Sequence, residues 1–158
     1  MSLEPIPFLD LKASYREIAE EIDAAIKEAL DQGDYVLGEP VRRFEEEFAA
    51  YCQTRFCVGV GSGVDALHLA LRAFAIGPGD EVITCANTFV GTALAISQTG
   101  AKPALVDCDP EYGVISIKGI ERALTHRTRA IVPVHLYGQR SEEHTSELQS
   151  PCNLVCRL

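Results

Sequence analysis

The sequence contains no apolar run that approaches the roughly 20 residues needed to cross a lipid bilayer. Its first ten residues also lack the basic stretch followed by an apolar stretch that marks a secretory signal peptide. Basic residues are scarce, since 14 lysines and arginines stand against 23 aspartates and glutamates, for a net charge of −9. Such a surface repels phosphate backbones. We therefore expect a cytoplasmic protein with neither a nucleic-acid partner nor a membrane partner.

The cysteines do not follow the pattern of a disulfide framework or a metal site. The first four lie in strand-like or helix-end segments, where we expect small buried apolar residues: Cys52, Cys57, Cys85 and Cys108. Cys152 and Cys156 form a C-x3-C pair, but a zinc site would need further ligands at suitable spacing. The sequence therefore predicts no metal.

Length and composition fit one soluble domain, because the chain has 158 residues, 47% of them hydrophobic and 23% charged. Isoleucines and leucines that recur at every fourth position predict a helix over residues 13–30. Gly33 is suited to a left-handed cap at its end. A second amphipathic helix is predicted over residues 39–51.

After residue 55 the pattern changes to an alternation of short strands and helices. Strands are predicted at residues 56–60, 81–84, 103–106 and 130–134, and helices at residues 64–74, 89–98 and 117–124. The strands are apolar on both faces, which is typical of a mainly parallel sheet with helices on both sides. The predicted fold class is therefore α/β, with ligands bound beyond the carboxyl ends of the strands.

The segment Gly61-Ser62-Gly63-Val64 connects the first of these strands to a helix. Glycines let the backbone approach a ligand closely, and the helix start presents free N–H groups and the positive end of its dipole. This combination suits a phosphate. An ordinary strand-to-helix turn explains the segment equally well. The segment lacks the third glycine of a dinucleotide-binding loop and the lysine of a P-loop.

Several short blocks occur in a characteristic order along the chain. They are Phe8-Leu9-Asp10-Leu11, Gly38 with Phe44-Glu45, Gly61-Ser62-Gly63-Val64-Asp65-Ala66-Leu67, Gly77-Pro78-Gly79-Asp80-Glu81-Val82-Ile83, Thr88-Phe89-Val90 and Val134-His135-Leu136-Tyr137-Gly138-Gln139. In order and spacing, this series resembles the DegT/DnrJ/EryC1/StrS aminotransferase family over nearly all of residues 5–139.

The resemblance implies the fold type I architecture of enzymes that depend on pyridoxal 5'-phosphate. Residues 1–139 would then form the N-terminal part of the large domain. It also implies transfer of an amino group, commonly from glutamate, to a keto-sugar linked to a nucleotide, by a homodimer.

The same resemblance assigns cofactor-binding roles to individual residues. Gly63 and Val64 match the residues that hold the cofactor phosphate, and Ser62 stands where its hydroxyl could replace the one that valine lacks. Phe89 matches the aromatic residue that stacks on the pyridine ring, although from the residues alone a core position is favoured. His135 and Gln139 follow the last predicted strand, at the expected ligand edge. A histidine there is more often a structural residue than a catalyst.

No lysine of the chain lies in a motif that resembles the family's catalytic lysine, which must form a Schiff base with the cofactor. The four lysines are Lys12, Lys27, Lys102 and Lys118. In relatives, this lysine and the acidic partner of the pyridine nitrogen come well after the segment that ends at Gln139. We therefore expect no catalytic residue in this chain, and an inactive fragment of a transaminase.

Residues 140–158 interrupt the alternation where another helix is due. Residues 140–150 match the translation of a sequencing-library adapter, so we expect the whole segment 140–158 to be a non-native tail. A genuine divergent tail is the alternative.

Three other functions stay open from the sequence. A dinucleotide-binding oxidoreductase domain would need an acidic residue about 20 positions after the glycine turn. Glu81 is near that distance, but it lies at a strand start. A non-catalytic regulatory relative, and a sugar dehydratase with histidine at the lysine position, would both share the fold.

Overall fold

The computed structural model describes residues 8–138, 141, 156 and 157. The chain divides into two compact units, residues 1–59 and residues 60–158. Each unit is described separately below. Most of the predicted tail, and Gln139, lie outside the described residues, so the proposed boundary at residue 139 stays a prediction.

The first unit contains helices α1 (Leu11–Glu17), α2 (Ala19–Gln32) and α3 (Glu39–Tyr51). The single helix predicted over residues 13–30 is therefore divided in two. The break occurs at Ile18, whose backbone (φ −127°, ψ 17°) is not helical. Gly33 adopts the left-handed conformation (φ 68°) and ends α2, as predicted. The bounds of α3 agree with the prediction.

Helix α2 is amphipathic, but side chains of its apolar stripe remain exposed. Ile26 and Leu30 are 54% and 59% exposed. On α3, the rings of Phe44 and Phe48 stack with their centroids 5.4 Å apart, yet both side chains also remain exposed. The helical period thus predicted the bounds of α3, but neither the start of α2 nor the exposure of the apolar faces of the two helices.

The second unit is built on a sheet with the strand order β2-β1-β3-β4. Its strands are β1 (Glu81–Cys85), β2 (Lys102–Val106), β3 (Thr128–Val132) and β4 (Cys156–Arg157). Strand β1 pairs in parallel with both β2 and β3, while β4 pairs antiparallel with β3. The predicted mainly parallel sheet is therefore confirmed.

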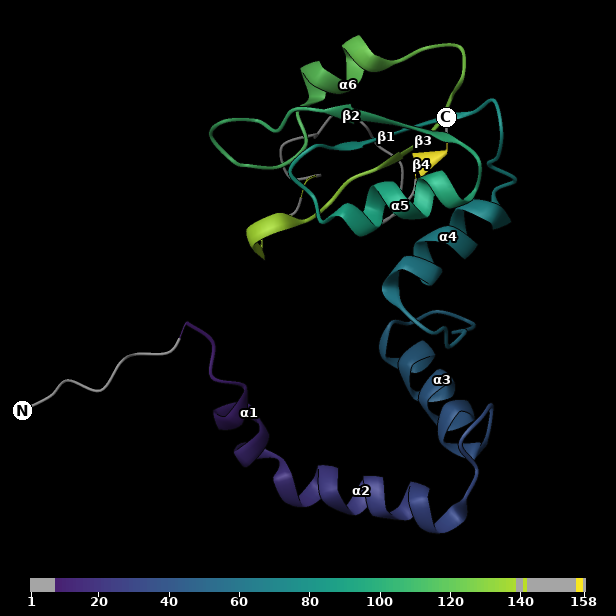
Figure 1. Cartoon of the computed structure of the whole chain (residues 1–158), viewed down its shortest axis with the longest axis vertical. Helices are drawn as coiled ribbons and strands as arrows, with labels where there is room; N and C mark the ends of the chain where they lie inside the picture. The colour runs from purple at the N-terminus through teal and green to yellow at the C-terminus, as the bar shows by residue number, and fades with distance from the viewer. Residues whose placement is uncertain (1–7, 139–140, 142–155, 158) are drawn as a thin grey trace, which may run out of the picture. The chain divides into compact units, whose positions relative to one another are not determined.

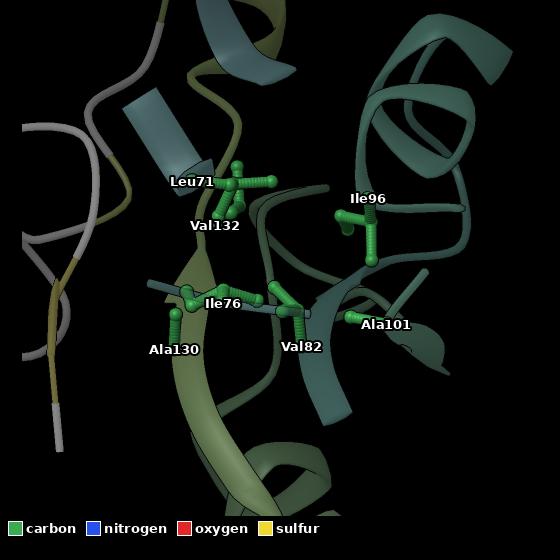
Figure 2. Close-up of a cluster of buried hydrophobic side chains, with 7 residues drawn as sticks. All are labelled: Leu71, Ile76, Val82, Ile96, Ala101, Ala130 and Val132. Atoms are coloured by element: carbon green, nitrogen blue, oxygen red, sulfur yellow. The ribbon is translucent and has the colours of Figure 1, made fainter. Parts of the chain in front are cut away.

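Helices cover both faces of this sheet, as the α/β prediction requires. Figure 1 shows α5 (Val90–Gln98) on one face and α6 (Ile117–Ala123) on the other. Helix α4 (Gly63–Ala73) packs against α5. Neighbouring strand residues point to opposite faces. Val82 therefore joins Leu71 and Ile96 in one core cluster (Figure 2), and Ile83 joins a second cluster around α6.

The strand predicted at residues 56–60 is wrong, because this segment has no strand structure. It runs into α4 without pairing to any strand of the described part of the chain. Phe56 and Val58 are 73% and 75% exposed. An extended apolar segment becomes a strand only where a neighbouring edge accepts its hydrogen bonds, and no strand pairing of the described residues includes this segment.

Burial of the cysteines follows the prediction in part. Cys85 is buried, Cys57 and Cys108 are half-buried, and Cys52 is exposed, which contradicts the expectation for that residue.

Among the helices that the structure describes, none is long and apolar enough to span a membrane.

Candidate functional site

The candidate site begins where α4 starts. Ser62 has an extended backbone (φ −161°, ψ 166°) and is the N-cap of this helix. Its Oγ accepts a hydrogen bond from the N–H of Asp65 at 3.2 Å and donates one to Oδ2 of Asp65 at 2.8 Å. The Ser62 hydroxyl is therefore engaged in capping the helix, which fixes the direction in which the first turn points.

Two backbone donors of this first turn have no acceptor within the part of the chain that the structure describes. No hydrogen bond among the described residues uses the N–H of Gly63 or Val64. A Cβ atom on Gly63 would meet nothing within 4 Å, so the space around this residue is open. Unpaired N–H groups at the positive end of an 11-residue helix form a donor set that fits a phosphate group.

Phe89 lies beside this turn, at the start of α5. It is the N-cap of α5, follows the carboxyl end of β1, and is 75% exposed. A Cβ atom on Gly91 would lie 2.7 Å from Cε1 of Phe89 and 3.0 Å from Cγ2 of Val64. The structure therefore brings Phe89 and Val64 together around Gly91. The alternative in which Phe89 is a core residue is wrong, since its ring is largely exposed.

His135 follows β3 at the same carboxyl edge of the sheet as Cys85 and Phe89. Its Nδ1 accepts a hydrogen bond from the N–H of Ser141 at 3.1 Å. Ser141 belongs to the segment predicted to be a non-native tail, so this contact tests neither a structural role nor a cofactor contact of His135. Gln139, the last predicted site residue, lies outside the described residues.

The opposite edge of the sheet carries an ion-pair network. The buried carboxylate of Glu81 accepts hydrogen bonds from Oγ1 of Thr125 and from Nη2 of Arg127, both at 2.7 Å. Nζ of Lys102 lies 3.8 Å from Oε1 of Glu81. The Thr125 hydroxyl, and then the charges of Arg127 and Lys102, lower the pKa of Glu81.

This network bears on two of the sequence interpretations. Glu81 starts β1 and is held there by neighbouring cations, so it is at the wrong edge of the sheet to bind a ribose beside the glycine turn. Lys102 starts β2 at that same edge, and Lys118 belongs to α6. Lys102 is therefore not at the carboxyl edge, and Lys118, on α6, lies on the face of the sheet opposite to α5 (Figure 1).

Sequence reasoning missed two residues next to the candidate site. Gly91 lets the first turns of α4 and α5 approach each other, and Asn87 links two loops at the carboxyl edge. Asn87 could have been suspected, since an asparagine between a strand and a helix often bonds to backbone groups. Gly91 carried no signal, because its contact with Val64 depends on the packing of two helices.

The mainly parallel sheet with helices on both faces defines an α/β domain, and an open helix start and an exposed aromatic ring lie together beside it. The family model for the DegT/DnrJ/EryC1/StrS aminotransferase family matches residues 16–151. The chain belongs to this family.

Curated relatives share a large part of the sequence. The chain is 52% identical over 137 residues to the dTDP-3-amino-3,4,6-trideoxy-alpha-D-glucose transaminase of Streptomyces venezuelae, which covers 87% of the chain and 36% of that enzyme. It is 46% identical over 144 residues to the dTDP-3-amino-3,6-dideoxy-alpha-D-galactopyranose transaminase of Aneurinibacillus thermoaerophilus, covering 90% and 39% respectively. The chain thus spans about a third of the length of these relatives.

Solved structures agree with the fold. The S. venezuelae DesV structure in complex with a ketimine intermediate superposes with a TM-score of 0.83 and 50% identity, over 89% of the chain and 38% of DesV. The structure of ntda from Bacillus subtilis with bound cofactor PMP has a TM-score of 0.83 and 34% identity, over 91% of the chain and 33% of that protein. The fold type I expectation is therefore confirmed.

Proposed function

We propose that the protein to which this chain belongs is a pyridoxal-phosphate-dependent aminotransferase that acts on a nucleotide-linked keto-sugar, with glutamate as amino donor. The observation that carries the proposal is the pair of open N–H groups at Gly63 and Val64, next to the exposed ring of Phe89. The names of these two relatives support the substrate class, since they describe transaminases of dTDP-linked sugars. We expect the full-length protein to be a cytoplasmic homodimer.

In this proposal each part of the site has a separate task. The N–H groups of Gly63 and Val64 bind the phosphate, and the Ser62 cap keeps them pointed at it. The face of Phe89 supports the pyridine ring. When bound, the cofactor supplies an electron sink for amino transfer. Gln139 and His135 are proposed as further contacts at this edge.

Isothermal titration of the 158-residue chain with pyridoxamine 5'-phosphate tests the phosphate site, because this form of the cofactor cannot react with a lysine amine. Gly63→Pro removes one N–H at the first helical position, where proline is well tolerated after an extended residue such as Ser62. Losing one hydrogen bond to a charged group should weaken binding by about 1.5–3 kcal/mol.

Gly63→Ala is the matched control, since it keeps the N–H and its Cβ meets no other atom within 4 Å. It should bind pyridoxamine 5'-phosphate more tightly than the proline variant, because the N–H group that donates to the phosphate is kept. Equal binding by the proline and alanine variants would contradict the phosphate site, as would equal affinity for pyridoxamine without its phosphate.

We further propose that the chain alone has no transaminase activity. Lys102 lies at the other edge of the sheet, and Lys118 lies on α6. Lys12 and Lys27 belong to the first unit. After incubation with pyridoxal phosphate and borohydride, peptide mass spectrometry should show no single preferred lysine adduct. A stoichiometric adduct at one lysine, accompanied by turnover, would overturn this part.

A regulatory role is the second candidate, favoured by one relative. The chain is 44% identical over 137 residues to a protein of Geobacillus stearothermophilus named "Pleiotropic regulatory protein", covering 87% of the chain and 37% of that protein. A sugar dehydratase on the same fold is the third possibility. Assays of the full-length protein for amino transfer, and for loss of water from the same keto-sugar, separate these alternatives.

A further inference from the structure

Asn87 links two loops at the carboxyl edge of the sheet. It lies in the loop between β1 and α5, two residues before Phe89. Its Nδ2 donates a hydrogen bond to the carbonyl oxygen of Gly113 at 2.9 Å, and its Oδ1 accepts one from the thiol of Cys85 at 2.6 Å. Exchange of the two amide atoms would place an oxygen against the Gly113 carbonyl, so only one orientation of the amide satisfies both bonds.

Both partners of Asn87 are fixed by the core. Cys85 is 1% exposed, and burial raises the pKa of its thiol, which keeps the proton that it donates. The loop around Gly113 is closed by two backbone hydrogen bonds of 2.8 Å, from Gly113 to Asp109 and from Asp109 to Val114. Val114 is itself 1% exposed. Asn87 therefore ties the β1–α5 loop to a rigid support.

Within the described residues, the ring of Phe89 has no comparable support of its own. It is 75% exposed and belongs to neither core cluster. Two atoms on one side of the ring, Cε1 and Cδ1, lie within 2.8 Å of the Cβ position of Gly91, and Cγ2 of Val64 lies 3.0 Å from the same position. The direction of the ring thus depends on the course of the chain just before it, where Asn87 lies.

We infer that Asn87 is a positioning residue, which holds the Phe89 ring beside the phosphate-binding turn by anchoring the β1–α5 loop to Gly113. This inference rests on the proposed function for the identity of the ligand. The position of the ring itself can be measured without any ligand.

Nuclear Overhauser contacts provide that measurement. Ring atoms of Phe89 and Cγ2 of Val64 both come within 3.0 Å of the Cβ position of Gly91, so the ring should give contacts to the Gly91 α-protons and the Val64 methyl group. Asn87→Ala removes both hydrogen bonds, and Asn87→Asp removes only the donor to Gly113 at constant size. We expect these ring contacts to weaken at least twofold relative to contacts within the core in both variants.

Ser97→Ala is the matched control, because Ser97 is an exposed residue of α5 that also donates one side-chain hydrogen bond to a backbone carbonyl, that of Ala93 at 2.9 Å. It should leave the ring contacts unchanged. Unchanged ring contacts in Asn87→Ala or in Asn87→Asp would overturn the inference. So would a lower melting temperature with the ring contacts preserved, since that is the result of a purely structural role.

Titration with pyridoxamine 5'-phosphate and with inorganic phosphate links the ring position to binding. Asn87→Ala should weaken binding of the coenzyme about threefold to tenfold, the range of one aromatic contact, and leave inorganic phosphate binding unchanged. If the original chain binds neither molecule, the proposed function fails, and the ring contacts still decide the role of Asn87. An equal loss of affinity for pyridoxamine 5'-phosphate and for inorganic phosphate would contradict a role of Asn87 that is specific to the ring.

Discussion

The first turns of α4 and α5 are in direct contact, because Gly91 has no side chain to keep Val64 away. A Cβ atom on Gly91 would lie only 3.0 Å from Cγ2 of Val64, closer than ordinary van der Waals contact. Helix α5 begins at the carboxyl edge of the sheet, after β1, and its contact with Val64 brings the start of α4 to the same edge. This contact therefore sets the distance between the two halves of the candidate site.

Gly91→Val should therefore destabilise the second unit and displace the Phe89 ring. Overpacking of this kind costs about 1–3 kcal/mol. Urea unfolding measures the free energy, with Gly63→Ala as the control because its Cβ meets open space. A valine variant as stable as the original chain would show that the two helices are free to separate.

Ser62→Ala removes the N-cap of α4. Both hydrogen bonds between Ser62 and Asp65 would be lost, so we expect about 1 kcal/mol less stability in urea unfolding. Ser97→Ala, which removes a single exposed hydrogen bond, should stay within about 0.5 kcal/mol of the original chain. Equal effects of the two changes would argue against a capping role.

Stability should fall in acid because of Glu81. Thr125, and then Arg127 and Lys102, lower the pKa of Glu81 in the folded state, so its contribution is complete above its unfolded pKa, about 4.3. The contribution disappears as the pH falls through the lower folded value.

Urea midpoints measured at neutral pH and at successively lower pH values test this dependence. Glu81→Gln should lower the midpoint at neutral pH and flatten its change with pH. Glu121→Gln on the exposed surface of α6 is the control and should leave the profile unchanged. A Glu81→Gln profile parallel to the original one would contradict the assignment.

Ile96→Ala tests the core cluster between the sheet and α5. Ile96 is fully buried, and truncation should cost about 2–5 kcal/mol because it leaves a cavity. Ile26→Ala on α2 is the comparison, since this side chain is 54% exposed and should change stability by no more than about 0.5 kcal/mol. Similar losses from both variants would mean that the stripe of α2 is buried in solution.

The sequence predicted the elements whose signals are local. The glycine cap at Gly33, the bounds of α3 and the strands β1, β2 and β3 follow from periodicity and turn residues, to within about two residues. The break at Ile18 could not be predicted, because the apolar stripe continues through it. The prediction of a strand at residues 56–60 was wrong for a different reason. A strand forms only beside a partner strand, and the local sequence does not indicate whether such a partner is present.

The amino-acid order alone determined the α/β class, the amphipathic helices and the helix start at Gly63, because each depends on residues close together along the chain. Only the tertiary structure decided that Val64 and Phe89 meet around Gly91, that Asn87 reaches Gly113, and that Glu81 faces Arg127. These contacts join segments separated by up to 46 residues, and their geometry is set by how helices and strands pack.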